Sequence, residues 1–171
     1  APNLFSDADG RYRAHDMQIH RSERPVYTVF SLWDTFRSLH PLFNLMQRDR
    51  TPDFIATFID NAKTGGGLLP VWELAACETN CMIGYHAVPV IAYFCGIRGF
   101  DTEQALQYMV TSADADLFGR KAFRELGFIP TDVEGESVSK TLEYAYDDWC
   151  IARMAEGMGK TDIANDFYHR A

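Results

Sequence analysis

The sequence predicts an all-α fold built from helical hairpins. Three observations support this: Pro and Gly divide the chain into stretches of helical length, almost no segment alternates apolar and polar residues, and apolar residues recur at helical spacing. We expect about seven helices with short connections, an arrangement that builds bundles, α-solenoids or α/α toroids. No fixed-period repeat is visible, which disfavours a solenoid.

The N-terminal part of the chain is predicted to be irregular up to its first helix. Residues 1–27 are polar, and the Asp-Ala-Asp-Gly of residues 7–10 is typical of a turn. Apolar side chains at helical spacing predict the first helix from Ser31 to about Gln47. Pro41 should kink this helix, because proline has no backbone N–H to donate.

A loop is predicted between the next two helices. Thr51 is a capping residue and Pro52 suits a first helical position, so a helix should begin there and end at the glycines of residues 65–67. Residues 68–80 are predicted as loop. The apolar segment from Met82 to Ile97 has the length of a helix, and its uniform apolarity predicts an inner, mostly buried one.

The last four predicted helices each have a capping residue or a Gly/Pro stop signal at one end. They begin at Asp101, near residue 117, at Ser137 or Ser139 and at Thr161; the second and third end at Gly127 and about Met158.

Composition excludes several classes of protein. A chain of 171 residues with 47% hydrophobic and 23% charged residues is ordinary for one globular domain, which excludes disordered and fibrous classes. No window of 18 apolar residues could cross a membrane. The net charge of -8, without a Lys/Arg cluster, gives no electrostatic basis for binding nucleic acid. Aromatic residues at 13%, many beside carboxylates, suit carbohydrate or large apolar partners.

The four cysteines are too few and too scattered for a disulfide scaffold, and we expect buried free thiols. Cys77, Cys81, His86 and Cys95 do not have the spacing of paired zinc knuckles, so no metal ligand is assigned. The chain begins with Ala1 and not Met, which predicts either a removed signal or an internal piece of a longer protein.

Trp33-Asp34 is the first candidate for a binding site. A Trp face can stack on the apolar C–H face of a sugar ring while the adjacent carboxylate accepts hydrogen bonds from two hydroxyls. The alternative is a helix-start Asp that accepts from backbone N–H groups beside a core Trp. The residue pattern alone leaves both open.

Other carboxylates and one histidine are weaker candidates. Glu73 and Glu78 flank the predicted loop and could enter a pocket or simply be solvated. Asp147 and Asp148 resemble a catalytic pair, but adjacent helical residues point about 100° apart. One of them could face a pocket and the other a neighbouring helix N-terminus, or both could belong to a buried structural network. His86 is expected to be a hydrogen-bonded core histidine.

Long ordered strings recur across the chain. One contains Phe30-Ser31-Leu32-Trp33-Asp34-Thr35, and another contains Trp72-Glu73. These strings resemble glycoside hydrolase family 92. Cys77 stands where family sequences usually have Asn, and Ala14 where a Gly is common. The strings cover residues 7–13, 27–41, 69–74, 78–89 and 137–150.

The resemblance implies an inverting, calcium-dependent exo-α-mannosidase, with many family members acting on α-1,2-linked mannose of N-glycans or fungal mannans. Family members have a β-sandwich followed by an (α/α)6 toroid, and residues 1–171 resemble about the first half of that toroid, an incomplete N-terminal portion of the catalytic domain. Trp33 and Asp34 match the pair that holds the non-reducing mannose. Glu73, Glu78 and His86 are second-rank candidates from their matched loops.

The resemblance also implies what lies outside the chain. The family's general acid, general base and calcium ligands fall beyond Ala171, so no residue here is assigned a catalytic or metal-binding role. We expect the isolated segment to be inactive and to need the remainder of its polypeptide or a complementary chain. The expected substrates are α-mannoside glycans, and the expected location is secreted, periplasmic or on the cell surface. A non-catalytic sugar-binding segment and a helical scaffold are the alternatives.

Overall fold

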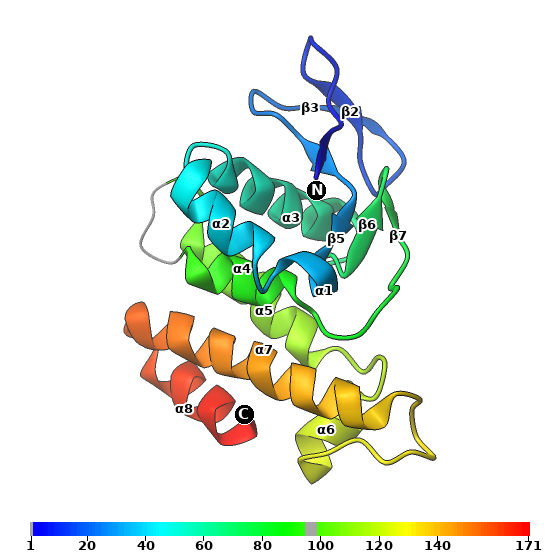
Figure 1. Ribbon diagram of the computed structural model, residues 1–171, viewed down its shortest axis with the longest axis vertical. Coiled ribbons are helices and arrows are strands. Elements are labelled where there is room, and N and C mark those ends of the chain that lie inside the picture. Colours follow the sequence, from blue (N-terminus) through cyan, green and yellow to red (C-terminus); the bar gives the residue numbers. More distant parts are fainter. Residues whose placement is uncertain (1, 95–98) are drawn as a thin grey trace.

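The computed structural model describes residues 2–94 and 99–171, and Figure 1 shows helices with small sheets near the N-terminus. About half of the described residues are helical. The described helices are α1 (Leu32–Thr35), α2 (Leu39–Met46), α3 (Thr51–Thr64), α4 (Ala87–Tyr93), α5 (Thr102–Asp114), α6 (Arg120–Leu126), α7 (Ser137–Gly157) and α8 (Thr161–Arg170). The described strands are β1 (Asn3–Leu4), β2 (Arg11–Arg13), β3 (Ile19–Arg21), β4 (Tyr27–Thr28), β5 (Phe30–Ser31), β6 (Trp72–Leu74) and β7 (Cys77–Glu78).

The expectation of an all-α chain is wrong for residues 3–31 and 72–78, which contain the described strands. Strand β1 pairs with β4, β2 pairs with β3, and β5, β6 and β7 form a three-stranded antiparallel sheet. Each strand has only two or three residues, too few for alternation to show in the sequence. The turn at residues 7–10 is confirmed, because Gly10 N–H donates to Asp7 O at 2.9 Å with a φ of 83° at Gly10.

The β6–β7 hairpin has an unusual two-residue connection. Ala75 and Ala76 both have positive φ, a conformation that Asn and Gly normally supply in tight hairpin turns. Buried partners stabilise the turn: Ala75 N–H donates to Thr28 Oγ1 at 2.6 Å, and Ala76 N–H donates to Glu73 Oε1 at 2.7 Å. The sequence therefore lacks the usual hairpin signal, since the turn depends on distant side chains.

Two predicted helices are shorter than expected. The single kinked helix of residues 31–47 is two helices, α1 and α2, separated by residues 36–38. Pro41 lies in the first turn of α2, where its missing N–H would have no helical partner. The helix predicted from Met82 to Ile97 begins only at Ala87, because Met82 and Gly84 have positive φ. Its predicted C-terminal end falls at residues 95–97, outside the described residues.

The remaining helices agree with the sequence predictions to within a few residues. Helix α3 has Pro in its first turn and ends at Gly65, with Gly66 and Gly67 left-handed. Asp101 caps α5 by accepting from Gln104 N–H at 3.0 Å. Gly127, with a φ of 77°, ends α6. Helix α7 spans Ser137–Gly157, and α8 begins at Thr161.

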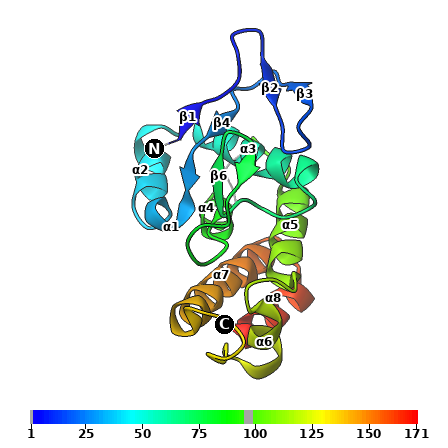
Figure 2. The same cartoon turned by 90° about the vertical axis from the view of Figure 1, so that its right-hand side faces the viewer.

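Helix α7 is the centre of the packing, and it contacts α4, α5, α6 and α8. Its residues Ile151, Met154 and Ala155 are fully buried in the main core. Figure 2 shows the strands at one end of the molecule, α6–α8 at the other, and α5 running between them. The helices are consistent with paired hairpins. That they form half of an (α/α)6 toroid stays a prediction.

The cysteines only partly match the expectation of buried free thiols. Cys150 is buried, but Cys77 and Cys81 are exposed, and Cys95 lies outside the described residues. Burial raises the pKa of the Cys150 thiol to about 12.

Across the described residues, every helix is too short or too polar to pass through a bilayer.

Candidate functional site

Trp33 and Asp34 lie on α1, a single helical turn directly after β5. The buried side chain of Leu32 anchors this turn in the main core, and Ser31 pairs with Trp72 of β6. Trp33 is half-buried and Asp34 is exposed. The carboxylate of Asp34 accepts a hydrogen bond from the Ser31 hydroxyl and caps no backbone N–H in the structure. In the alternative interpretation, Asp34 would cap the helix beside a buried Trp33. The structure shows neither feature at this turn.

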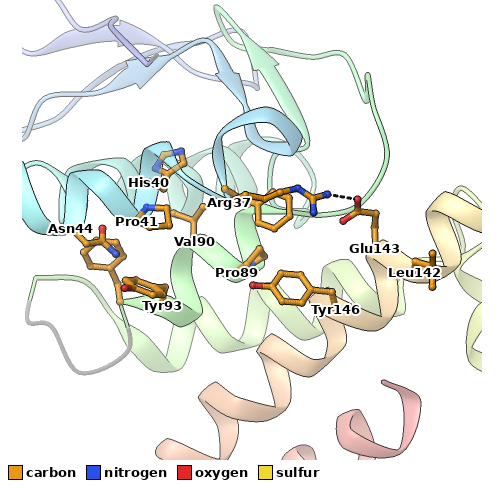
Figure 3. Close-up of a pocket in the computed structure, with 12 residues that line it drawn as sticks. Arg37, His40, Pro41, Asn44, Pro89, Val90, Tyr93, Leu142, Glu143 and Tyr146 are labelled. Carbon is orange, nitrogen blue, oxygen red and sulfur yellow. Dashed lines mark hydrogen bonds and ion pairs between the residues drawn. The ribbon is translucent and has the colours of Figure 1, made fainter.

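An ion pair lies beside the Trp33 ring. Glu143 of α7 accepts from Trp33 Nε1–H at 3.3 Å and pairs with the guanidinium of Arg37, as Figure 3 shows for Arg37. The Arg37 guanidinium carbon also lies 5.9 Å from the Trp33 ring centre. The sequence analysis missed both charged residues as site candidates, although each lies inside one of the family strings.

His86 connects this ion pair to the core. Its ring is 1% exposed and stacks on Phe36, with the ring centres 4.1 Å apart. Its Nδ1 lies 2.8 Å from Asp147 Oδ1, and its Nε2 lies 3.3 Å from Glu143 Oε2. The expectation of a hydrogen-bonded core histidine is confirmed. His86 is brought to Trp33 through Glu143 rather than by direct contact.

Asp147 and Asp148 are both fully buried and belong to one structural network. Asp147 accepts from Tyr85 N–H at 2.8 Å in addition to its contact with His86. Asp148 accepts from Tyr85 Oη at 2.6 Å and from Arg170 Nε at 2.9 Å. Burial raises the pKa of Asp148 to about 7, because Arg170 and Tyr85 offset only part of the loss of solvation. Neither carboxylate is free to meet a substrate within the described residues.

Glu73 and Glu78 hold the β6–β7 hairpin together. Glu73 is 1% exposed and accepts from the Thr28 hydroxyl at 2.9 Å; burial raises the pKa of its carboxyl group. Glu78 accepts from the backbone N–H groups of Val71 and Trp72, each at 2.9 Å. The alternative of solvated loop carboxylates is wrong for Glu73. Both carboxylates are engaged in hydrogen bonds within the chain.

A cavity of about 770 Å³ opens between α2, α4 and α7 (Figure 3). Arg37 and Glu143 form part of its wall, and Tyr93 and Tyr146 add aromatic faces. His40 and Asn44 are buried in the wall, and their side-chain polar atoms have no hydrogen-bond partner among the described residues. Burial lowers the pKa of His40 to about 4. No sequence signal marked this cavity.

The arrangement around α1 offers a binding surface and no resident metal site. Trp33 presents an aromatic ring held by a carboxylate, and Asp34 adds an exposed acceptor, which together suit a hydroxyl-rich ring. Over residues 2–94 and 99–171, no cluster of three or more His, Cys, Asp or Glu side chains could hold a metal ion.

Comparison with known proteins decides the family. The sequence model of the glycosyl hydrolase family 92 catalytic domain matches residues 1–171. The chain belongs to glycosyl hydrolase family 92. The family GH92 alpha-mannosidase BT3965 from Bacteroides thetaiotaomicron is 45% identical, with a TM-score of 0.96 over 98% of this chain and 23% of its own. The family GH92 inverting mannosidase BT2199 from the same organism is 35% identical, with a TM-score of 0.85 over 96% of this chain and 24% of its own.

A more distant relative comes from a fungus. A protein of Arthroderma benhamiae described as an uncharacterized secreted glycosidase is 27% identical over 113 residues, which are 55% of this chain and 15% of the relative. This family 92 chain thus spans about a quarter of the length of the solved structures that it matches.

Proposed function

We propose that this chain is the N-terminal portion of the catalytic domain of an inverting, calcium-dependent exo-α-mannosidase that hydrolyses α-1,2-linked mannosides. The observation that carries this is the 45% identity to BT3965 over nearly the whole chain, together with an aromatic ring and an exposed carboxylate side by side on α1. The name of BT2199, an inverting mannosidase, supports inversion.

In this proposal Trp33 and Asp34 hold the mannose ring at the non-reducing end. The Trp33 face would cover the C–H face of the sugar, and Asp34 would accept from its hydroxyls. This orients the substrate before any bond is broken. Glu73, Glu78 and His86 remain second-rank candidates, and their engaged polar atoms favour support of the site over direct contact.

Inversion requires an acid to protonate the leaving oxygen and a base to activate water, with carboxyl groups about 6.5–9.5 Å apart. We assign neither role to a residue of this chain. We propose that the calcium ligands lie outside this chain, as the family resemblance implies. Calcium would contribute oxygen coordination of the sugar hydroxyls.

An exposed apolar stripe supports a partner segment. Val138, Leu142, Tyr146 and Trp149 are spaced four, four and three residues apart on α7, and each is more than 40% exposed. Such a helix face is normally covered. We propose that the remainder of the same polypeptide covers it, and that the isolated segment is inactive. The secreted relative supports a secreted, periplasmic or cell-surface location. The two mannosidases that the chain resembles support α-mannoside glycans as substrates, and we propose N-glycans among them.

Asp34→Ala in the full-length polypeptide tests the proposal. We expect mannose release from an α-1,2-mannobioside to fall by at least tenfold, because the loss of one hydrogen bond to a charged group corresponds to about that factor. The thermal unfolding midpoint should stay unchanged. Asp49→Ala removes an exposed carboxylate after α2 and is the matched control. A chelator should abolish activity that added calcium restores.

The rival functions give different results. A non-catalytic sugar-binding protein would bind mannose without releasing it from the disaccharide. A helical scaffold would show neither binding nor any effect of Asp34→Ala on a mannoside assay. Loss of activity that parallels loss of folding in Asp34→Ala would contradict the assigned role.

A further inference from the structure

We propose that Glu143 is a positioning residue that fixes the indole ring of Trp33 in the orientation that receives the sugar. The inference rests on the proposed function for its effect on substrate, but its structural basis is separate. Trp33 and Glu143 are 110 residues apart in the sequence, and their side chains meet between α1 and α7.

Trp33 needs an external constraint on its ring. Helix α1 has only four residues, and a single turn has little helical stability of its own. The indole is half-buried, so packing holds one side of it and leaves the rest accessible. An indole has one N–H donor, and Glu143 Oε1 accepts from it at 3.3 Å. This contact therefore limits rotation of the ring about the Cβ–Cγ bond of the side chain.

The Glu143 carboxylate has two further neighbours, an ion-pair partner in Arg37 and the nearby ring of His86. Its Oε1 also pairs with Arg37, and its Oε2 lies 3.3 Å from His86 Nε2. The side chain is only 15% exposed. His86 in turn is fixed by Asp147 Oδ1 at 2.8 Å. The Trp33 ring is thus oriented through a chain of contacts that ends in the buried middle of α7.

Arg37 adds a second constraint from the same helical region. It follows Trp33 by four residues, and its guanidinium carbon lies 5.9 Å from the Trp33 ring centre and 4.5 Å from the Phe36 ring centre. Figure 3 shows the guanidinium directed at the Glu143 carboxylate. Without Glu143, Arg37 would be free to turn toward solvent, and both constraints on the indole would be lost together.

A ring fixed in advance lowers the ordering cost of binding and leaves the chemical step unchanged. We therefore expect Glu143→Ala in the full-length polypeptide to raise KM for a mannoside about tenfold with kcat within twofold, as expected for one hydrogen bond to a charged group. Glu143→Gln keeps an oxygen acceptor for Trp33 but not the charge that pairs with Arg37, so its KM should fall between wild type and Glu143→Ala. Glu125→Gln, an exposed glutamate of α6, is the control.

A double-mutant cycle with Trp33→Phe shows whether Glu143 acts through the indole. Phenylalanine has no N–H to donate, so Glu143→Ala should raise KM no further in the Trp33→Phe background. Equal and additive effects in both backgrounds would overturn the inference. So would a loss of thermal stability in Glu143→Ala and Glu143→Gln that accounts for their loss of activity.

Fluorine NMR of protein labelled with 5-fluorotryptophan separates this inference from the proposed function. The Trp33 resonance, identified by its disappearance in Trp33→Phe, should shift or broaden in Glu143→Ala and stay unchanged in Glu125→Gln. A shifted resonance in an enzyme whose mannoside KM does not respond to Trp33→Phe would support the contact and contradict the proposed function. An unshifted resonance would overturn the positioning role directly.

Discussion

His86 Nδ1 lies 2.8 Å from Asp147 Oδ1, so a loop residue that precedes α4 is attached to the middle of α7, 61 residues later. Both side chains are buried, with exposed fractions of 1% and 0%. Asp147 Oδ2 also accepts from the backbone N–H of Tyr85 at 2.8 Å. The two oxygens of one carboxylate therefore fix both the backbone and the side chain of the loop that supports Glu143.

Asp147→Asn should lower the free energy of unfolding by about 1–3 kcal/mol, because it leaves a buried hydrogen-bonding group of His86 or Tyr85 without its partner. An amide has one acceptor oxygen, so its NH2 group would face either His86 Nδ1 or the Tyr85 N–H. The thermal unfolding midpoint measures the loss. Asp132→Asn changes an exposed aspartate and should leave the midpoint unchanged; an equal loss in both variants would contradict the prediction.

Gly84→Ala should destabilise the same loop. Gly84 has a φ of 84°, and an added Cβ would lie 2.2 Å from His86 Nε2. The left-handed backbone alone disfavours alanine by about 1–2 kcal/mol, and displacement of the ring adds to that cost. We expect reduced thermal stability and broadened signals from the His86 ring by NMR. Gly135→Ala, with open space around its Cβ and no left-handed backbone, is the control; similar stability for both variants would contradict the prediction.

Local signals predicted most of the helical C-terminal half. Helices α5, α6 and α7 have end signals within the sequence itself, such as the Asp101 cap and the left-handed Gly127. The strands could not be predicted, because two or three residues show no periodicity. The turn at Ala75 and Ala76 depends on Thr28 and Glu73, which are brought to it only by the fold.

The candidate site divides in the same way. Trp33 and Asp34 are adjacent in sequence, so their residue types alone suggest a sugar-binding pair. Glu143 and Arg37 are recognisable as partners of the indole only once the fold brings their side chains to Trp33. No sequence signal predicted that the ring nitrogens of His40 have no hydrogen-bond partner among the described residues, because a histidine among apolar residues is ordinary in a core.

Glu78→Gln should loosen the β6–β7 hairpin without removing the exposed binding surface. Its two carboxylate oxygens accept from the N–H groups of Val71, Trp72 and Asn80, and an amide offers only one acceptor atom. We expect a loss of about 1–2 kcal/mol from an unsatisfied backbone group. Hydrogen exchange should quicken at the amides of Val71 and Trp72. Glu23→Gln, at an exposed position, is the control, and unchanged exchange in Glu78→Gln would contradict the structural role.

His40 should make the fold less stable in mild acid. Its ring lies among Phe43, Phe54 and Phe58, with ring centres 6.0, 6.0 and 6.4 Å away, and burial lowers its pKa to about 4. In the unfolded chain the ring takes up a proton near pH 6.5. Between these values the unfolded state binds more protons, so stability is lost as the pH falls, by about 3 kcal/mol in all.

The variant His40→Phe isolates this contribution, since it keeps an aromatic ring and removes the titration. Asp148 acts in the opposite direction, because its raised pKa makes stability fall as the pH rises toward 7, but wild type and variant share that effect. The difference in thermal midpoint between them should therefore grow in favour of His40→Phe as the pH is lowered from 7 to 4.5. His169→Phe, at an exposed position on α8, should show no such trend. Parallel pH profiles for wild type and His40→Phe would mean that another part of the polypeptide supplies the His40 ring with a partner.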